Sequence, residues 1–228
     1  MGELFQYVAD NWTEIQFAAQ SHFLVVLYAV SLSTLIAVAL AVVLHTNRLS
    51  PPSWSTRLRA GTLETALLVA SAMLTIPSLA LFGLLQPILG LGIAPALFGL
   101  TLYGIYPVLR NTVAGLNSVD SAVLEAARGI GMGPVRRLVR IQLPIAWPVL
   151  LSGVRVSVLI SISITVVAAI VSDLGFGELV LTGLARLGGA GAIQSMIVGT
   201  LGPVAVAAIF EVVFALLKRF TTPRGIRV

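Results

Sequence analysis

The sequence predicts an all-α membrane protein with five transmembrane helices. Of its 228 residues, 57% are hydrophobic and only 10% are charged, whereas a typical soluble chain has about 25% charged residues. The mean hydropathy is +1.01. Five apolar segments, separated by polar or glycine-rich ones, are candidates to cross a hydrocarbon core of about 30 Å. We interpret residues 1–228 as a single transmembrane domain.

The expected spans cover about residues 23–44, 63–85, 95–109, 145–171 and 193–217. Span two contains Pro77, which frees a carbonyl group and bends a helix within the membrane. Thr75 and Ser78 stand beside this proline and are placed to satisfy the freed backbone. Pro107 is expected to bend the exit of span three.

Residues 1–21 are expected to form an interfacial segment on the outer side of the membrane. They carry acidic residues (Glu3, Asp10 and Glu14) where a signal peptide would need basic ones. Apolar residues recur there at a spacing of three to four, which is typical of an amphipathic helix on a membrane surface. They are Leu4, Val8, Trp12, Ile15 and Ala19. A poorly ordered terminus is the alternative.

The distribution of basic residues predicts the orientation of the chain. They gather in the loops after spans one and three and in the C-terminal tail. They are Arg48, Arg57, Arg59, Arg110, Arg128, Arg136, Arg137, Arg140, Lys218, Arg219, Arg224 and Arg227. By the positive-inside tendency, the N-terminus lies outside and the C-terminus in the cytoplasm. The isoelectric point of about 10.4 therefore reflects cytoplasmic loops and does not indicate nucleic-acid binding.

A polar, arginine-bearing loop between spans three and four, residues 120–144, is the candidate docking site for a protein partner. Asp120 or Ser121 can cap a short helix that passes through Glu125. Gly131 ends that helix because glycine tolerates a positive φ. Pro144 suits the first turn of the next helix.

The stretch EAARGIGMGPVRRLVRIQLP, from Glu125 to Pro144, matches the EAA loop of bacterial ABC importer permeases, EAA-x3-G-x9-I-x-LP, at every defined position. Other stretches resemble the permeases of osmoprotectant importers, which carry glycine betaine, carnitine, choline or proline betaine. These stretches are Thr75–Leu97, Leu102–Met132, Leu143–Arg155 and Gly175–Leu184. The resemblance implies a type I, methionine-permease-like fold with a cytoplasmic coupling helix in the bacterial plasma (inner) membrane.

The resemblance also implies the partners of the chain. Such an importer has two permeases, two ATPase subunits and an external substrate-binding protein, and the second permease is either the same chain or a paralogue. The residues carried over to the ATPase contact are Glu125, Ala126, Ala127, Arg128 and Gly131. The small alanines let a partner surface approach closely.

We expect no catalysis and no cofactor in this chain itself. There is no phosphate loop of the form GxxxxGK[ST], so Mg-ATP belongs to the partner ATPase. His22 and His45 lie at opposite ends of span one, and the chain has no cysteine, so they do not indicate a metal site. The alternatives to an osmoprotectant permease are a permease for an amino acid or another small solute, and a non-transport docking subunit of the membrane.

Three ionisable residues lie inside the spans, where charges are expensive unless they have partners. We expect Arg155 to form a structural ion pair with Glu211 or Glu64, and a transport role is the alternative.

The remaining candidate site residues have hydroxyl or acidic side chains. Thr75, Ser78, Ser161 and Thr165 are candidates to line a polar pathway, although such hydroxyls commonly bond within their own helix. Segment 172–192 is expected on the outer face, as a loop, a short re-entrant helix or a contact for the binding protein through Asp173 and Glu178.

Overall fold

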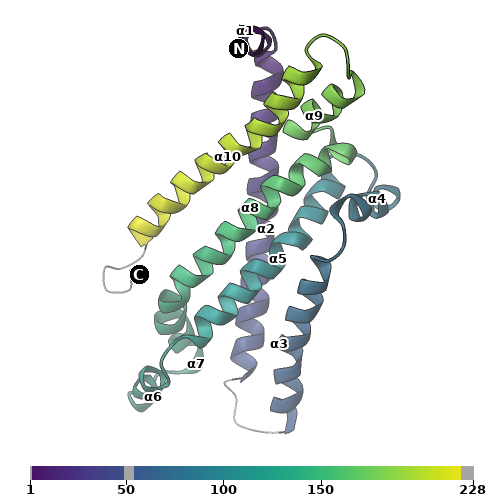
Figure 1. Ribbon diagram of the computed structural model, residues 1–228. Coiled ribbons are helices and arrows are strands. Elements are labelled where there is room, and N and C mark those ends of the chain that lie inside the picture. Colours follow the sequence, from purple (N-terminus) through teal and green to yellow (C-terminus); the bar gives the residue numbers. More distant parts are fainter. Residues whose placement is uncertain (1, 49–53, 222–228) are drawn as a thin grey trace.

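The computed structural model describes residues 2–48 and 54–221, and within them every regular element is a helix (Figure 1). The elements are α1 (Gly2–Asp10), α2 (Trp12–Arg48), α3 (Trp54–Met73), α4 (Ser78–Leu89), α5 (Ile93–Asn117), α6 (Ser121–Gly129), α7 (Pro134–Arg137), the π-helical turn η1 (Leu138–Gln142), α8 (Leu143–Ser172), α9 (Phe176–Ala185) and α10 (Ala192–Thr221). The predicted all-α class is therefore confirmed. Of the basic residues used to predict orientation, Arg224 and Arg227 lie outside the described residues.

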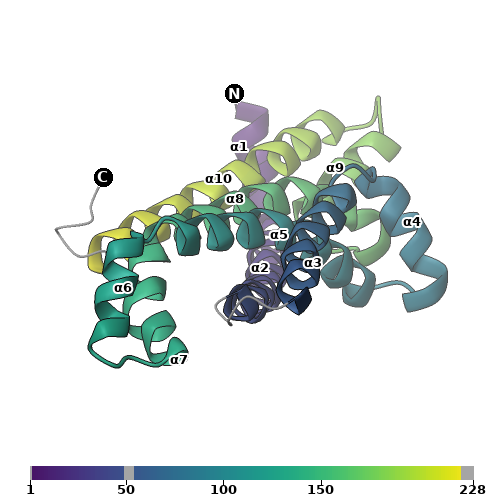
Figure 2. The same ribbon diagram turned by 90° about the horizontal axis from the view of Figure 1, so that it is seen from below.

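Helices α5 and α8 lie side by side at the centre of the bundle, and α2 packs on both (Figures 1 and 2). Small residues allow this close approach. A Cβ atom on Gly104 of α5 would lie 2.6 Å from the Oγ atoms of both Ser33 on α2 and Ser157 on α8. A Cβ atom on Gly153 would lie 2.6 Å from the Cβ atom of Asn111. Larger side chains would separate the helices, so these glycines fix the rotation of α8 against α5.

Four helices among the described residues are long and apolar enough to cross a membrane, and a fifth span results if a bent pair counts as one. That pair, Gly61–Met73 and Ser78–Leu89, meets at an angle of 96°. Span two is thus broken at residues 74–77, whereas the sequence suggested only a bend. The break follows from Pro77, which cannot donate a main-chain hydrogen bond. The hydroxyl of Tyr103 donates to the carbonyl of Ile76, the residue before this proline, at 2.6 Å.

Two span boundaries differ from the predictions. Residues 12–21 belong to α2, and Ile15 and Ala18 are buried in the cluster that includes Phe176 of α9, so only α1 is separate from the first span. Helix α5 continues ten residues beyond Pro107, so this proline does not mark the exit of span three. The amide of Asn111 donates to the carbonyl of Pro107 at 2.8 Å.

Candidate coupling and transport sites

Both ends of α6 are closed by the residues that the sequence indicated. The Asp120 carboxylate accepts a hydrogen bond from the amide of Ala122 at 2.8 Å, which is an N-cap. Gly131 has φ +79°, and its amide donates to the carbonyl of Arg128 at 2.9 Å. The amide of Met132 donates to the carbonyl of Ala127 at 3.0 Å. These two bonds form a Schellman motif, which satisfies the last carbonyls of the helix.

Helix α6 projects at the end of the bundle opposite α1 and α9 (Figure 1). Glu125, Ala126 and Arg128 are exposed, whereas Ala127 is buried at 4% exposure. Ala126 and Ala127 therefore do not present one common surface, and Ala127 packs against its own chain. The charged members of the predicted contact set, Glu125 and Arg128, are three residues apart and share one exposed side of α6.

The segment after α6 is helical, so the span-four helix begins at Pro134 and not near residue 145. Pro144 has no N–H group to continue the α-helical pattern. The π-helical turn η1 ends two residues before it, and the amide of Leu143 donates to the carbonyl of Leu138 there. Arg136 and Arg140 are exposed there. Arg137 is buried, and its Nε and Nη1 atoms have no hydrogen-bond partner among the described residues.

Arg155 of α8 and Glu211 of α10 form the expected ion pair. Arg155 Nη2 lies 2.6 Å from Glu211 Oε2, and Arg155 Nε donates to Glu211 Oε1 at 2.8 Å. This two-point geometry holds the guanidinium and carboxylate groups in one plane. Glu64 lies on α3, which packs on α2 and α5. The structure thus selects Glu211 from the two predicted partners.

The four predicted pathway hydroxyls are not brought together. Thr75 is exposed at the α3–α4 break and donates to the carbonyl of Ala72 at 2.7 Å, while Ser78 begins α4. Ser161 and Thr165 are buried on the inner side of α8, and Thr165 donates to the carbonyl of Ser161 at 2.7 Å. They face the bundle core.

Three other hydroxyls are exposed on α8 and α10, near the ion pair or farther along the same two helices. They are Ser152, Ser163 and Thr200. Their spacing from Arg155 and Glu211 along the helices was the signal that could have found them.

Helix α9 is held against the N-terminal part of α2. The amide of Gly175 donates to Ser21 Oγ at 3.0 Å, and the amide of Phe176 donates to His22 Nδ1 at 3.4 Å. His22 is fully buried. Its role is therefore to receive the N-terminus of α9, a contact between residues 154 positions apart that no local pattern indicates.

Segment 172–192 thus contains a short helix, and both of its predicted contact acids are exposed. Asp173 has a left-handed backbone, with φ 49°, at the end of α8. Glu178 lines a hollow of about 490 Å³ together with Glu14 and Arg186. Partial burial of Glu178 raises the pKa of its carboxyl group, and the charges of Asp173 and Glu14 raise it further.

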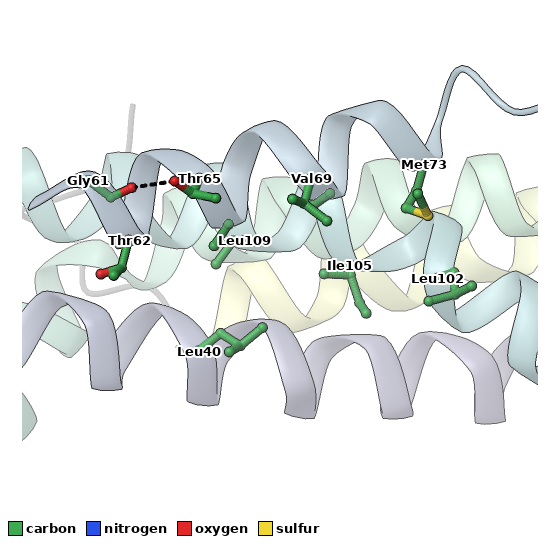
Figure 3. A pocket seen from close by; sticks show the side chains of 11 residues that line it. Leu40, Gly61, Thr62, Thr65, Val69, Met73, Leu102, Ile105 and Leu109 are labelled. Atoms are coloured by element: carbon green, nitrogen blue, oxygen red, sulfur yellow. Dashed lines mark hydrogen bonds between the residues drawn. The ribbon is translucent and has the colours of Figure 1, made fainter. Parts of the chain in front are cut away.

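A larger hollow of about 740 Å³ lies between α2, α3 and α5 (Figure 3). Its wall is almost entirely hydrocarbon, and Thr62 and Thr65 provide its two hydroxyl groups. Thr65 already donates to the carbonyl of Gly61 at 2.8 Å. This hollow offers few polar partners to a charged solute and suits apolar groups instead.

Comparisons with known proteins agree with this architecture. Residues 58–223 match the family described as "binding-protein-dependent transport system inner membrane component". The choline transport system permease protein OpuBB of Bacillus subtilis is 32% identical over 228 residues, covering 100% of this chain and 97% of that protein. The osmoprotectant import permease protein OsmW of Salmonella typhimurium is 33% identical over 227 residues, covering 97% of this chain and 98% of that protein.

The fold has a solved counterpart in the inward-facing MetNI methionine ABC transporter. The TM-score is 0.75 at 17% sequence identity, and the match covers 90% of this chain and 95% of the counterpart. This likeness shows the type I importer permease fold. The family match spans most of the chain, and the whole-length relatives are permease subunits. The chain therefore belongs to the family of inner-membrane permease components of binding-protein-dependent transport systems.

Proposed function

We propose that this chain forms the transmembrane pathway of an ATP-driven importer for small osmoprotectants of the glycine betaine and choline type. The substrate class is supported by relatives of 32% and 33% identity that align over nearly their whole length and are named for choline and osmoprotectant transport. A solute of this type carries a quaternary ammonium and crosses hydrocarbon poorly, so it needs a polar route through the bundle.

We assign the coupling of this pathway to ATP hydrolysis to α6. The structure of this helix is the observation that carries the proposal. The helix is capped at both ends, exposes Glu125 and Arg128, and is joined through α7 and η1 to α8. A separate ATPase that binds α6 would thus act directly on a membrane helix. Closure of the ATPase pair would shift the bundle between inward- and outward-facing states.

The remaining partners follow from the two ends of the molecule. With α6 in the cytoplasm, the N-terminus, α1 and α9 lie on the outer side of the inner membrane. Asp173 and Glu178 are placed there to contact an external binding protein. A second permease, either a copy of this chain or a paralogue, completes the pathway.

The test is uptake of labelled glycine betaine and choline into proteoliposomes that contain this chain, its cognate ATPase and any paired permease, with binding protein outside. The Glu125→Lys variant reverses a charge on α6. Asp10→Lys is the matched control, because Asp10 is an exposed acid on α1 at the opposite end of the molecule. We expect uptake to be lost with Glu125→Lys and retained with Asp10→Lys.

Other outcomes separate the parts of the proposal. If binding protein stimulates ATP hydrolysis but neither solute is taken up, the substrate class is wrong and amino acids are the next solutes to assay. If no ATPase associates with the wild-type chain, the role of α6 is wrong, and the chain is a docking subunit.

A further inference from the structure

Helix α8 has two sides of different chemistry. Its inner side packs on α5 and α2 and buries Gly153, Ser157 and Ser161. Its opposite side exposes Ser152, Arg155 and Ser163. In an α-helix, residues three, four, seven or eight positions apart share a side, so the polar exposed residues form one stripe along α8.

Helix α10 turns this stripe into a groove. Two hollows lie between α8 and α10, one after the other along the helices. The first has a volume of about 450 Å³ and a mostly apolar lining, in which Ser163 and Thr200 provide the two hydroxyl groups. The second has a volume of about 280 Å³ and is lined by residues that include Ser152, Arg155, Glu211 and Lys218. The ion pair joins the two walls of the second hollow.

The position of the ion pair argues against lipid as its neighbour. The side chains of Arg155 and Glu211 are 55% and 36% exposed. Glu211 lies seven residues before Lys218, which is about 10 Å along the helix axis. Lys218 and Arg219 suit the membrane interface, so the pair lies within the hydrocarbon layer. Charged groups at such a depth face other protein or a water-filled cavity.

The other side of the α8–α10 contact provides a comparison. There a hollow of about 600 Å³ between α2, α8 and α10 is lined almost wholly by hydrocarbon, including Leu35, Val154 and Phe210. That side suits lipid chains or an apolar helix. The two sides of this helix pair thus differ in that only the groove side has charged residues in its lining, and these lie in the second hollow.

We propose that the α8–α10 groove carrying Arg155 and Glu211 is the wall of the solute pathway, with the ion pair as its polar element in the cytoplasmic half. This inference rests on the proposed transport function and identifies its surface. An isolated carboxylate would hold a quaternary ammonium strongly, whereas a carboxylate engaged by Arg155 at two points has its charge largely compensated. The pair therefore provides a wet surface that a zwitterion or cation passes without being trapped.

The natural absence of cysteine makes the groove directly testable. Single variants Ser152→Cys and Ser163→Cys place a thiol in each hollow with little change in volume. Ile209→Cys is the control, because Ile209 is 53% exposed, lines neither hollow, and lies on the opposite side of α10 from Glu211 at nearly the same depth. Each variant is assembled with its ATPase and any paired permease in proteoliposomes. It is then treated with a charged, membrane-impermeant methanethiosulfonate from both sides.

We expect both serine-derived thiols to react on the order of tenfold faster than the control, because the reactive thiolate forms in water and not in hydrocarbon. Equal rates at all three positions would overturn the proposal. Reaction only with a lipid-soluble maleimide would show that the groove faces lipid, and reaction with neither reagent would show that a second permease covers it. Labelling does not depend on the solute, so fast labelling without uptake of betaine or choline would reject the substrate class alone.

Discussion

The phenol hydroxyl of Tyr103 donates a hydrogen bond to the main-chain carbonyl of Ile76, 2.6 Å away across the break between α3 and α4. Tyr103 is almost fully buried on α5, so this bond supplies a partner to a carbonyl that the broken helix leaves free. A break inside a membrane span is tolerated where a neighbouring helix provides such a partner. The bond thus anchors the turn to the central helix.

Replacing Tyr103 by phenylalanine should therefore destabilise the bundle. The variant leaves the Ile76 carbonyl without its partner, and the expected loss is about 1–3 kcal/mol. Thermal unfolding in detergent measures it. Tyr106→Phe is the control, because the Tyr106 hydroxyl accepts an exposed bond from Arg110 at 3.1 Å on the same helix. An equal effect of the two variants would contradict the anchoring role of Tyr103.

Reversing one charge of the Arg155–Glu211 pair should lower uptake severalfold. Arg155→Glu places two carboxylates together, and Glu211→Arg places two guanidinium groups together, so each variant replaces attraction by repulsion. The double variant should restore most of the activity, because it rebuilds the ion pair with the carboxylate on α8 and the guanidinium group on α10. Uptake is measured at equal membrane abundance. Additive losses in the double variant would show that the two residues act independently.

Two glycines at the C-terminal end of α6 should respond in opposite ways to substitution by alanine. Gly131 has φ +79°, so Gly131→Ala should weaken the end of α6 by about 1–2 kcal/mol even though nothing lies within 4 Å of the added methyl group. Gly129 is the last residue of α6, has no positive φ and lies in equally open space, so Gly129→Ala should stabilise the helix by up to about 1 kcal/mol. Hydrogen exchange of α6 amides in lipid nanodiscs reports both. Faster exchange in both variants would refute the assigned helix end.

The raised pKa of the Glu178 carboxyl group predicts that the stability of the protein depends on pH. Since its carboxyl group has a higher pKa in the folded protein than in the unfolded chain, its ionised form opposes folding, and stability from this group is gained as the pH falls through the raised pKa. Glu178→Gln should therefore be more stable than the wild type at neutral pH, and the difference should vanish below the ordinary glutamate pKa of 4.5. Asp173→Asn should reduce the difference. The measurement is the unfolding temperature of each variant and of the wild type, from neutral pH to below pH 4.5.

The sequence predicted what depends on local chemistry. The Asp120 cap and the Gly131 helix end are such features, because a side-chain acceptor and a positive φ act within a few residues. Hydropathy located four of the five expected spans as continuous helices, and the fifth is the pair that is broken at residues 74–77. The depth of Glu64 and Glu211 along their helices made both acids possible partners of Arg155, and in the structure Glu211 is the partner.

What the sequence could not indicate depends on which surfaces meet. Ser161 and Ser163 are two residues apart on α8, yet one is buried and the other exposed. Serines occur on both the buried and the exposed side of α8, so hydropathy does not fix its rotation. The close approach at Gly153 to Asn111 fixes it. The hydrogen bonds from α9 to Ser21 and His22 could not be predicted either, because they also depend on which helix surfaces meet.

The thirty residues of α8 span about 45 Å, close to the full thickness of a bilayer with its headgroups. Its N-terminal end continues without interruption into the π-helical turn η1, and three residues separate its C-terminal end from α9. A rod of this length that tilts by about 5° moves its far end by about 4 Å. A small displacement at the α6 end of α8 can therefore reach its α9 end through a single covalent element, so transmission along the molecule needs no relay of side chains from helix to helix.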